Sequence, residues 1–475
     1  MTSDFNSLPL SSSLLAVVGE LGYGQPTPIQ AQCIPALLNR RDVIGHSKTG
    51  SGKTAAFALP ILQVLRLEQR EIQALVVCPT RELCAQVARE IRKLGRRHSG
   101  LAVLELVGGQ PFRPQAMSLE RGVHVAVGTP GRLLDHLTRG TIDTRAVGTV
   151  VLDEADRMLD MGFDTDVKQI LGALPPSRQT VLFSATFPDS IEAMSRACQR
   201  DPLKITIGDG EHVAEIRQLA LPSHDARKVD SLYWIFREYR HVSVLVFCNF
   251  KTTVAQLHDT LVHAGFSVDC LHGDLEQFDR DQVLARFRNH SVRILIATDV
   301  VGRGIDLDDL DLVINYELPP QPEIYIHRIG RTGRAGKLGV AIALLGKGDT
   351  RKLGAIEALM GEKVERVPEL GHGECGIDGR TLAREATMAT ILISGGRKDK
   401  IRPGDILGAL TGAAGGFDSA DIGTIEIHPR LSYVAVSQGI RHEAVQCLNA
   451  GRIKAKRFRA SLVGRKRGGH ERGTT

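Results

Sequence analysis

The sequence predicts an α/β protein with two parallel-sheet lobes in tandem, followed by a small C-terminal α+β domain. Short apolar, β-branched runs alternate with helical patterns over residues 43–207, and the same alternation starts again near Val242. Strands that are buried on both faces of a parallel sheet have such continuous apolar runs. The 475 residues are too many for one hydrophobic core, and after Ala386 the order of patterns changes to β-α-β-β-α-β.

The composition is that of an ordinary soluble globular protein, with 42% hydrophobic and 24% charged residues. The net charge of +6 is compatible with nucleic acid, and residues 451–475 hold nine Lys or Arg against one acid, Glu471. The eight cysteines form no C-x-x-C pair, so neither a zinc site nor a disulfide framework is indicated. We expect a reducing, cytoplasmic setting. No signal peptide or run of 18 apolar residues is present, so no membrane partner is expected.

The first lobe is expected over residues 1–207. Its strands are predicted from six apolar runs, RDVIG, ALVVCPT, LAVLELVGG, VHVAVGTP, TVVLDEAD and TVLFSAT. The helix after the second run illustrates the other half of the pattern. Leu83, Val87, Ile91 and Leu94 recur at helical spacing, and Gly95 is expected to end the helix.

The second lobe is expected over residues 227–362, with strands in VSVLVFCNF, FSVDCLHG, VRILIATDV and DLVINYELP. Residues 208–226 lack sustained periodicity and are interpreted as a linker between the lobes. The pattern alone leaves open one continuous large sheet. A second linker, rich in glycine and charge, is expected over 363–386.

The third unit is expected over residues 387–463 and has the split βαβ order shared by RRM-type RNA binders. Only Tyr433 lies near its middle strands, so base stacking on the sheet face is not predicted. Basic residues before its first helix and on its last strand are predicted to form one RNA-binding face, although a solvated charged tail is an alternative. They are Lys398, Lys400, Arg402, Lys454, Lys456, Arg457 and Arg459. Residues 464–475 are expected to be a disordered basic tail.

Residues 47–54, SKTGSGKT, lie between an apolar run and a helical pattern and predict a phosphate-binding loop. Glycines let the backbone N–H groups and the next helix N-terminus point at phosphate oxygens, a lysine adds positive charge, and a threonine hydroxyl can bind Mg²⁺. The first glycine of the general pattern is replaced by serine. The predicted nucleotide-binding residues are Ser47, Lys48, Thr49, Gly50, Ser51, Gly52, Lys53 and Thr54.

The run TVVL places Asp153 and Glu154 at the carboxyl edge of the sheet, where open α/β folds bind ligands. Asp153 can hold Mg²⁺ against the phosphates, and Glu154 can orient and deprotonate an attacking water. In isolation this DEAD segment could be a solvated helix cap. Together with the phosphate-binding loop, it predicts nucleotide hydrolysis.

In the second lobe, residues 327–334, HRIGRTGR, place three arginines within seven residues. Arginines at this spacing can reach a γ-phosphate and stabilise the transition state, as an arginine finger does; surface ion pairing is the alternative. Because the phosphate-binding loop lies in the other lobe, hydrolysis would require the lobes to close on the nucleotide.

These segments resemble the motifs of the DEAD-box RNA helicases in family order, over almost the whole chain. They are GYGQPTPIQ at 22–30, SKTGSGKT, PTREL at 79–83, GG at 108–109, TPGR at 129–132, DEAD at 153–156, SAT at 184–186, VFCNF at 246–250, QFDR at 277–280, ATDVVGRGID at 297–306 and HRIGRTGR. With its third unit, the chain resembles the bacterial DbpA subfamily. The resemblance implies two RecA-like lobes, an RRM-like domain and an RNA-dependent ATPase.

The resemblance also implies roles at the ATP site. Tyr23 would stack on adenine, and Gln30 would hydrogen-bond its edge. Phe5 is either the upstream aromatic residue that supports this motif or a hydrophobic anchor of the terminus. The remaining implied residues are Gly304, Asp306, Arg331 and Arg334 on the second-lobe side of ATP, and Ser184 and Thr186, which would couple hydrolysis to unwinding. Serine at position 47 is common in the family.

The implied RNA contacts are small residues at strand ends and arginines, which suit contacts to phosphates and 2′-hydroxyls without base sequence. They are Thr80, Arg81, Gly108, Gly109, Thr129 and Arg132 in the first lobe, and Arg280, Thr298 and Asp299 in the second. The third unit is expected to recognise large-subunit ribosomal RNA in pre-ribosomal particles, and the protein to act as a monomer or weak dimer. An ATP-switched RNA clamp with little unwinding is the alternative function. A DNA translocase is a third.

Overall fold

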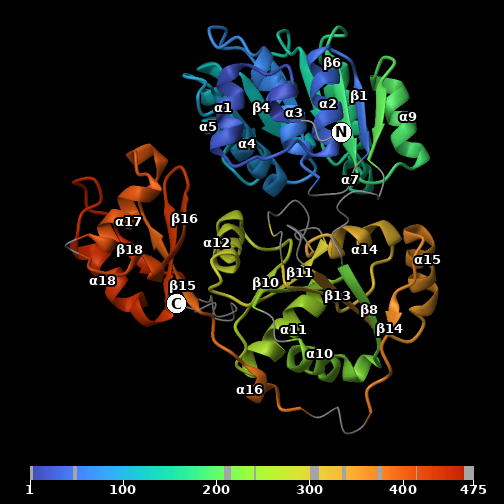
Figure 1. Cartoon of the computed structure of the whole chain (residues 1–475), viewed down its shortest axis with the longest axis vertical. Helices are drawn as coiled ribbons and strands as arrows, with labels where there is room; N and C mark the ends of the chain where they lie inside the picture. Colours follow the sequence, from blue (N-terminus) through green and yellow to red (C-terminus); the bar gives the residue numbers. More distant parts are fainter. Residues whose placement is uncertain are drawn as a thin grey trace, which may run out of the picture. The chain divides into compact units, whose positions relative to one another are not determined.

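The computed structural model describes residues 4–46, 51–207, 216–239, 242–299, 307, 310–333, 338–371, 377–412 and 415–464 (Figure 1). These residues form two compact units, one before residue 214 and one after it. The predictions for Ser47, Lys48, Thr49, Gly50, Gly304, Asp306, Arg334 and the tail from 465 lie outside the described residues. No helix in the described ranges is long and apolar enough to cross a membrane.

The first unit contains a seven-stranded sheet in the order β3-β4-β2-β5-β6-β1-β7, with every neighbouring pair parallel. Its strands are β1 (Val43–His46), β2 (Ala74–Val77), β3 (Val103–Leu106), β4 (Val125–Gly128), β5 (Thr149–Leu152), β6 (Gln179–Ser184) and β7 (Leu203–Thr206). The first six are the predicted strands. The parallel lobe is therefore confirmed, with β7 as an additional edge strand.

Helices cover both faces of this sheet, each with its own apolar core. They are α1 (Ser12–Glu20), α2 (Pro28–Leu38), α3 (Lys53–Val64), α4 (Arg81–Leu94), α5 (Phe112–Glu120), α6 (Pro130–Thr138), α7 (Ala155–Asp160), α8 (Asp164–Gly172) and α9 (Asp189–Cys198), preceded by the 3₁₀ turn η1 (Phe5–Ser7). Helix α4 has the predicted bounds: Thr80 caps its start, and Gly95 follows its last residue.

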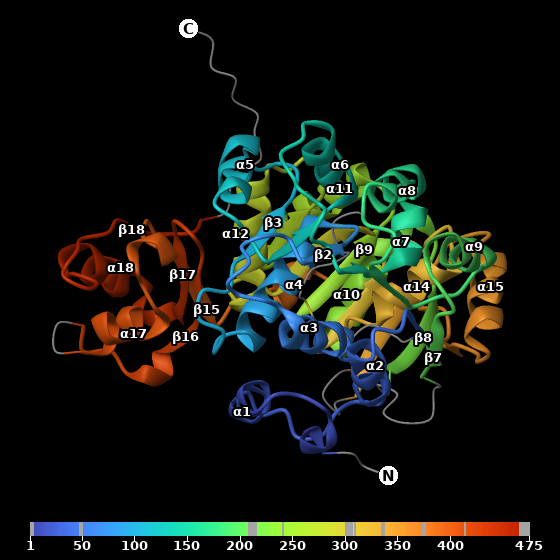
Figure 2. The ribbon, with the colours of Figure 1, turned by 90° about the horizontal axis from the view of Figure 1, so that it is seen from above.

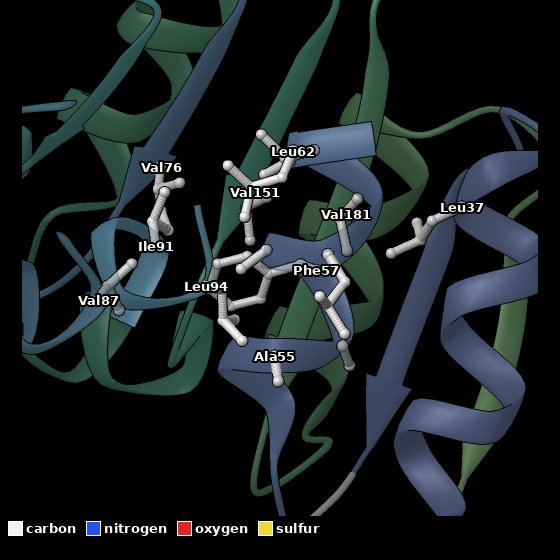
Figure 3. Packing of buried hydrophobic residues seen from close by; sticks show 14 of the residues in the cluster. Leu37, Ala55, Phe57, Leu62, Val76, Val87, Ile91, Leu94, Val151 and Val181 are labelled. Carbon is white, nitrogen blue, oxygen red and sulfur yellow. The ribbon is translucent and has the colours of Figure 1, made fainter. Parts of the chain in front are cut away.

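Figure 3 shows the apolar residues of α3 and α4 against the first-unit sheet. Val87, Ile91 and Leu94 of α4 are fully buried, as is Phe57 of α3. Burying a side chain of this size contributes roughly 1.5–3 kcal/mol. This packing fixes the helix N-termini relative to the carboxyl ends of the strands, where the predicted site residues lie.

The second unit contains another seven-stranded parallel sheet, in the order β10-β11-β9-β12-β13-β8-β14. Its strands are β8 (Ile216–Pro222), β9 (Val244–Cys248), β10 (Val268–Leu271), β11 (Ile294–Thr298), β12 (Leu312–Asn315), β13 (Gly339–Leu345) and β14 (Glu365–Arg366). Its helices are α10 (Lys228–Glu238), α11 (Lys251–His263), α12 (Gln277–Arg288), α14 (Pro322–Ile329), α15 (Thr350–Met360) and α16 (Gly379–Leu382).

Parts of both expected linkers belong to the second lobe. Strand β8 lies within 208–226 and pairs with β13 over its whole length. Strand β14 and helix α16 lie within 363–386, and α16 contacts α10, where Tyr233 packs on Gly379. Their signal in the sequence is weak because β8 is buried only over residues 219–221 and β14 has two exposed residues.

The C-terminal domain has the predicted β-α-β-β-α-β order, with an antiparallel sheet β16-β17-β15-β18. Its elements are β15 (Met388–Ile393), η3 (Arg397–Asp399), α17 (Pro403–Thr411), η4 (Ser419–Asp421), β16 (Ile422–Ile427), β17 (Ser432–Ser437), η5 (Gln438–Ile440), α18 (Arg441–Ala450) and β18 (Ala460–Leu462). Both long helices lie on one side of the sheet (Figure 2). The opposite face of the sheet is not covered by α17 or α18.

Candidate active site and nucleic-acid interface

The end of the phosphate-binding loop is held by residues that precede α2 and lie within it. Gly52 has φ +90°, and a Cβ there would lie 2.4 Å from Nε2 of Gln30. The hydroxyl of Thr27 donates to the Ser51 carbonyl at 2.7 Å, and Nε2 of Gln30 donates to the Gly52 carbonyl at 3.1 Å. Glycine is therefore required at position 52 both by its left-handed backbone and by the close approach of Gln30.

The side-chain amide of Gln30 links two backbone segments. Its oxygen also accepts a hydrogen bond from the Thr27 N–H at 3.0 Å, and the side chain is buried. Tyr23 lies nearby in the sequence and donates its hydroxyl to Glu90 at 2.5 Å, while the buried Phe5 ring packs edge-on against it at 6.1 Å. Phe5 contacts Tyr23 and also belongs to the buried apolar cluster, so its position fits both interpretations of this residue. The contacts of Tyr23 and Gln30 with adenine stay predictions.

Three acidic residues at the end of β5 are buried near the first residue of α3. Asp153, Glu154 and Asp156 are each at most 5% exposed, and Lys53 is 7% exposed. Burial raises the pKa of Asp153 to about 6, against the opposing effect of the Lys53 charge. Three buried carboxylates lie near two buried cations, Lys53 and Arg157, so a net negative charge is left that a further cation would neutralise. This charge balance fits Mg²⁺ held by Asp153 and the Thr54 hydroxyl.

Glu154 has an unusual backbone and a carboxylate oxygen without a hydrogen bond. It has φ +53° and ψ +54° at the N-cap of α7, a conformation that costs a non-glycine residue on the order of 1–3 kcal/mol. Its buried Oε2 accepts no hydrogen bond in the described part of the chain and lies 4.0 Å from Nε of Arg157. A buried acceptor of this kind can receive a hydrogen bond from a water molecule.

Asp156 connects this acidic segment to the SAT segment after β6. Its Oδ2 accepts hydrogen bonds from the Thr186 N–H and hydroxyl, both at 2.9 Å, and from the Ala185 N–H at 3.1 Å. The Ser184 hydroxyl donates to the Thr186 carbonyl. His46, at the end of β1, contacts the Ala185 carbonyl at 3.1 Å. Asp156 is not among the predicted site residues, although its place as the third acid of DEAD is visible in the sequence.

The six predicted RNA residues of the first lobe follow the neighbouring strands β2, β3 and β4. Thr80 and Thr129 are the N-cap residues of α4 and α6. The guanidinium of Arg81 lies against Gly109, where a Cβ would be 2.0 Å from Nη1.

Gly108 also approaches the guanidinium of Arg81. Arg132 donates to the Gln110 carbonyl at 3.1 Å and to Oε1 of Gln115 at 2.9 Å. The structure therefore brings these motifs together at one edge of the sheet, and their contacts with RNA stay predictions. We name the set Thr80, Arg81, Gly108, Gly109, Thr129 and Arg132 the first-lobe RNA edge.

In the second lobe, Arg328 is a scaffold residue. Its side chain is 2% exposed and donates to both carboxylate oxygens of Asp299 at 2.6 Å and to Oδ1 of Asn249 at 2.9 Å. Arg328, which is not among the residues predicted at the ATP site, is therefore not available to a γ-phosphate, and the roles of Arg331 and Arg334 stay predictions. The charge of Arg328 is used to hold the ends of β9 and β11 together.

The other second-lobe candidates are placed only in part. Arg331 is 5% exposed and follows α14. Thr298 ends β11, and Arg280 lies in the first turn of α12. Both follow strands of the second sheet, so they share its carboxyl edge with Asp299. Their contacts with RNA stay predictions.

The basic residues of the C-terminal domain are exposed, and two of their segments meet. Nζ of Lys454 donates to the Lys400 carbonyl at 2.7 Å and pairs with Asp405 at 3.1 Å. The expectation that Lys454, Lys456 and Arg457 lie on the last strand is wrong, because β18 begins at Ala460. β18 contains only three residues, and Lys454 begins a turn closed by pairing of Ile453 with Lys456. The set Lys398, Lys400, Arg402, Lys454, Lys456 and Arg457 is named the C-terminal basic face.

The sheet face opposite α17 and α18 packs on the second lobe. Arg288, the last residue of α12, donates to both oxygens of Glu426 at 2.8 Å. The hydroxyls of Ser291 and Thr390 lie 2.7 Å apart, and Nδ2 of Asn289 donates to Thr390 at 3.3 Å. Tyr433, whose ring lies edge-on to His428, is fully buried. The face that carries stacking aromatics in RRM-type binders is therefore covered here at Tyr433.

Comparison with known proteins agrees with these three parts. Residues 27–194 match the DEAD/DEAH box helicase family, 227–336 the helicase conserved C-terminal domain and 390–462 the DbpA RNA binding domain. The chain is 46% identical to the ATP-dependent RNA helicase DbpA of Escherichia coli (strain K12), over 97% of this chain and 99% of that protein. It is 34% identical to DbpA of Bacillus subtilis (strain 168), with the same coverage.

Solved structures resemble the chain over about its two lobes. Dbp5 of S. cerevisiae bound to RNA and ADP BeF3 has a TM-score of 0.71 and 33% identity, covering 77% of this chain and 95% of that one. Mss116p bound to ssRNA and AMP-PNP has a TM-score of 0.72 and 27% identity, covering 79% and 81%. The chain therefore belongs to the DbpA family of DEAD-box ATP-dependent RNA helicases, RNA-dependent enzymes that hydrolyse ATP.

Proposed function

We propose that this helicase unwinds short duplexes in large-subunit ribosomal RNA, within pre-ribosomal particles in the cytoplasm, by closing its two lobes on ATP and RNA. The observation that carries the closure is the division of the hydrolytic groups. Lys53, Asp153 and Glu154 lie together in the first lobe, whereas Arg331 and Arg334 belong to the second. Each set is incomplete for hydrolysis without the other.

In the first lobe, Lys53 and the N–H groups at the start of α3 bind the phosphates of ATP. Glu154 orients the attacking water and takes its proton at Oε2, which accepts no hydrogen bond from the residues that the structure describes. Mg²⁺, held by Thr54 and Asp153, would neutralise charge on the phosphate oxygens. Arg331 and Arg334 stabilise the charge that develops during phosphoryl transfer.

RNA binds to the first-lobe RNA edge through its phosphates and sugars, together with Arg280, Thr298 and Asp299. A strand held along both lobes is bent when the lobes close, and a short duplex then loses its pairing. The bonds from Asp156 to Thr186 support the coupling role, because they connect the acidic segment to SAT. The C-terminal basic face supplies the preference for structured ribosomal RNA.

The replacement Glu154→Gln tests the hydrolytic role. The variant should bind ATP and RNA as the wild type does, because the amide keeps the size of the side chain. ATP turnover with saturating RNA should fall by about 10²–10⁴-fold, since the general base is lost. Near-normal turnover would exclude this role.

Lys53→Ala is the contrasting variant and should lose nucleotide affinity.

ATPase rates with total ribosomal RNA, unrelated RNA and DNA then test the substrate. We expect that RNA stimulates the ATPase activity and DNA does not. Ribosomal RNA should reach half-maximal stimulation at a lower concentration than unrelated RNA. Equal stimulation by all three polymers contradicts the proposed substrate.

A further inference from the structure

Helix α5 buries a polar residue where an apolar one would be expected. Gln115 is 4% exposed, and among the residues that the structure describes in α5 it is the only one that is buried. A buried amide is stable only when its donor and acceptor groups are hydrogen-bonded, and an apolar side chain of equal size would serve packing as well. The choice of glutamine therefore points to a function for the amide itself.

Three groups determine how this amide is oriented. Nε2 of Gln115 donates to the Val107 carbonyl at 3.0 Å, and Oε1 accepts from Nη1 of Arg132 at 2.9 Å. The carbonyl can only accept and the guanidinium can only donate, so the amide fits in one orientation. Oε1 also lies 3.0 Å from Nε2 of His136, which therefore carries a hydrogen and donates it.

His136 belongs to this network as a neutral ring. It is fully buried, and burial together with the charge of Arg132 lowers its pKa to about 4. A neutral imidazole has one N–H and one acceptor. The N–H faces Gln115, Nδ1 accepts from the Thr141 hydroxyl at 2.7 Å, and the Phe112 ring stacks on the imidazole at 4.2 Å. The ring therefore stays neutral near neutral pH.

Gln115 connects the GG and TPGR segments of the first-lobe RNA edge. The Val107 carbonyl, to which it donates, immediately precedes GG. The Gln110 carbonyl, immediately after GG, accepts from Nη1 of Arg132 at 3.1 Å. The glycine pair is therefore held on both sides by two side chains that are hydrogen-bonded to each other.

The same bonds determine which part of the guanidinium is left for RNA. Nη1 of Arg132 has two hydrogens, and the bonds to Gln110 and Gln115 use both. Nη2 has no hydrogen-bond partner in the described part of the chain, and the side chain is 14% exposed. A phosphate at this edge can therefore bind an arginine whose position is already fixed, so that less ordering is needed on binding.

We propose that Gln115 is a positioning residue for RNA binding, which acts through Arg132. This inference rests on the proposed contact of Arg132 with RNA. Without the amide, the guanidinium loses an acceptor and must be ordered when RNA binds. The affinity for RNA therefore falls, while the rate of ATP hydrolysis at saturating RNA is retained.

The test uses the full-length protein and measures the RNA concentration that gives half-maximal ATPase activity, the maximal rate and Tm. Gln115→Met keeps the length of the side chain and removes both hydrogen-bonding groups. It should raise the half-maximal RNA concentration about tenfold, the effect of one charge-assisted hydrogen bond, at an unchanged maximal rate. In a protein that already carries Arg132→Ala, the same replacement should raise that concentration no further.

Gln115→Glu is a second variant, which keeps the size of the side chain and the acceptor Oε1. It should also raise the half-maximal RNA concentration, because its negative charge pairs with Arg132 and competes with the phosphate.

Gln199→Met is the matched control. This buried amide donates to the carbonyls of Val43 and Thr180, near the amino ends of β1 and β6 and so away from the RNA edge. The control should lower Tm as Gln115→Met does and leave the half-maximal RNA concentration unchanged.

The two proposals fail in different ways. If Arg132→Ala alone leaves the half-maximal RNA concentration unchanged, the proposed RNA contact of Arg132 is wrong and the positioning role fails with it. If Arg132→Ala raises that concentration but neither Gln115 variant does, the contact stands and the positioning role is overturned. A further rise when Gln115→Met is added to Arg132→Ala also overturns it, as does an equal rise caused by Gln199→Met.

Discussion

At Gly109 the backbone has φ +74°, and the guanidinium of Arg81 occupies the space where a side chain would begin. Two separate motifs, PTREL and GG, therefore depend on one contact. The glycine is required for two physical reasons: only glycine adopts this backbone without strain, and only glycine leaves room for the arginine. Arg81 is held where a phosphate of the RNA strand is expected.

Gly109→Ala should therefore weaken RNA binding more than it weakens folding. The left-handed backbone costs about 1–2 kcal/mol with a side chain, and Arg81 must also move. Gly100→Ala is the matched control, since Gly100 has φ +85° and nothing within 4 Å of a Cβ. Both variants should lose similar thermal stability. Only Gly109→Ala should raise the RNA concentration that gives half-maximal ATPase activity. The expected rise is about tenfold, because one charge-assisted hydrogen bond from Arg81 to RNA would be lost. Equal RNA dependence in both variants would contradict this role of Arg81.

Among the elements, α12 serves two surfaces. Its first turn carries Gln277 and Arg280 of the QFDR motif, and its last residue, Arg288, forms a bidentate pair with Glu426 of β16. Burial alone would raise the pKa of Glu426, but its contacts with His428 and Arg288 lower that pKa to about 2. A depressed carboxyl pKa gives stability that is fully present above about pH 4.5 and is lost as the pH falls toward 2. The ion pair of Glu426 with Arg288 should therefore be lost only in acid, since neither partner changes its charge near neutral pH.

Arg288→Ala should loosen the C-terminal domain from the second lobe. The removal leaves a mostly buried carboxylate without its main partner, which costs on the order of 1–3 kcal/mol. Hydrogen exchange of β15 and β17 should increase, and the charge-swapped pair R288E/E426R should restore part of the protection. Arg217 and Glu365 form a similar bidentate pair that is half exposed, so Arg217→Ala should change stability by less than about 1 kcal/mol. If Arg288→Ala lowers stability no more than Arg217→Ala does, burial does not make the Arg288–Glu426 pair stronger than the Arg217–Glu365 pair.

The sequence predicts elements well where burial on both faces leaves a continuous apolar run. Strands β2, β4, β5 and β6 are buried throughout and have such runs, whereas helix α4 was predicted from its apolar residues at helical spacing. Strands β7 and β14 carry mainly exposed or half-exposed residues, and β8 ends in Pro222, so a pattern of burial does not reveal them. β13 reads GVAIALL and could have been found by the same rule.

The site was predictable where a motif fixes both residue type and place, as at Lys53 and Asp153. Two features depend on contacts between distant segments and have no local signal. One is the use of Arg328 to hold Asp299 and Asn249. The other is the burial of Tyr433, because the sequence does not tell which surface covers a sheet face.

At the scale of the whole molecule, the proposed function assigns the general and the specific parts of RNA recognition to different domains of one chain. The lobes offer small residues and arginines at strand ends, which suit any RNA strand. The C-terminal basic face is built around the contact of Lys454 with Lys400 and is set apart from the covered sheet face. Removing the domain would also expose Asn289, which is only 1% exposed beside it. Point substitutions therefore separate the two functions better than truncation does.

The double variant K456A/R457A should reduce RNA preference without changing the lobes. Both side chains are exposed, so folding should be unaffected. The ratio of half-saturating concentrations for unrelated RNA and a ribosomal RNA fragment should fall toward one, because the lobes alone do not discriminate. The slope of log affinity against log salt for the ribosomal fragment should decrease in magnitude by about 1.4–1.8, since each phosphate contact that is made releases about 0.7–0.9 of a counterion and two contacts are removed. Maximal ATPase at saturating RNA should remain.

Arg81→Ala is the reciprocal variant, because it removes a contact that every RNA strand makes. It should raise both half-saturating concentrations by the same factor and leave their ratio unchanged. Arg351→Ala, an exposed arginine on α15, is the control for a general loss of positive charge and should change neither quantity. If K456A/R457A raises both concentrations equally, or if Arg81→Ala changes their ratio, recognition is shared between lobes and C-terminal domain and the division proposed here is wrong.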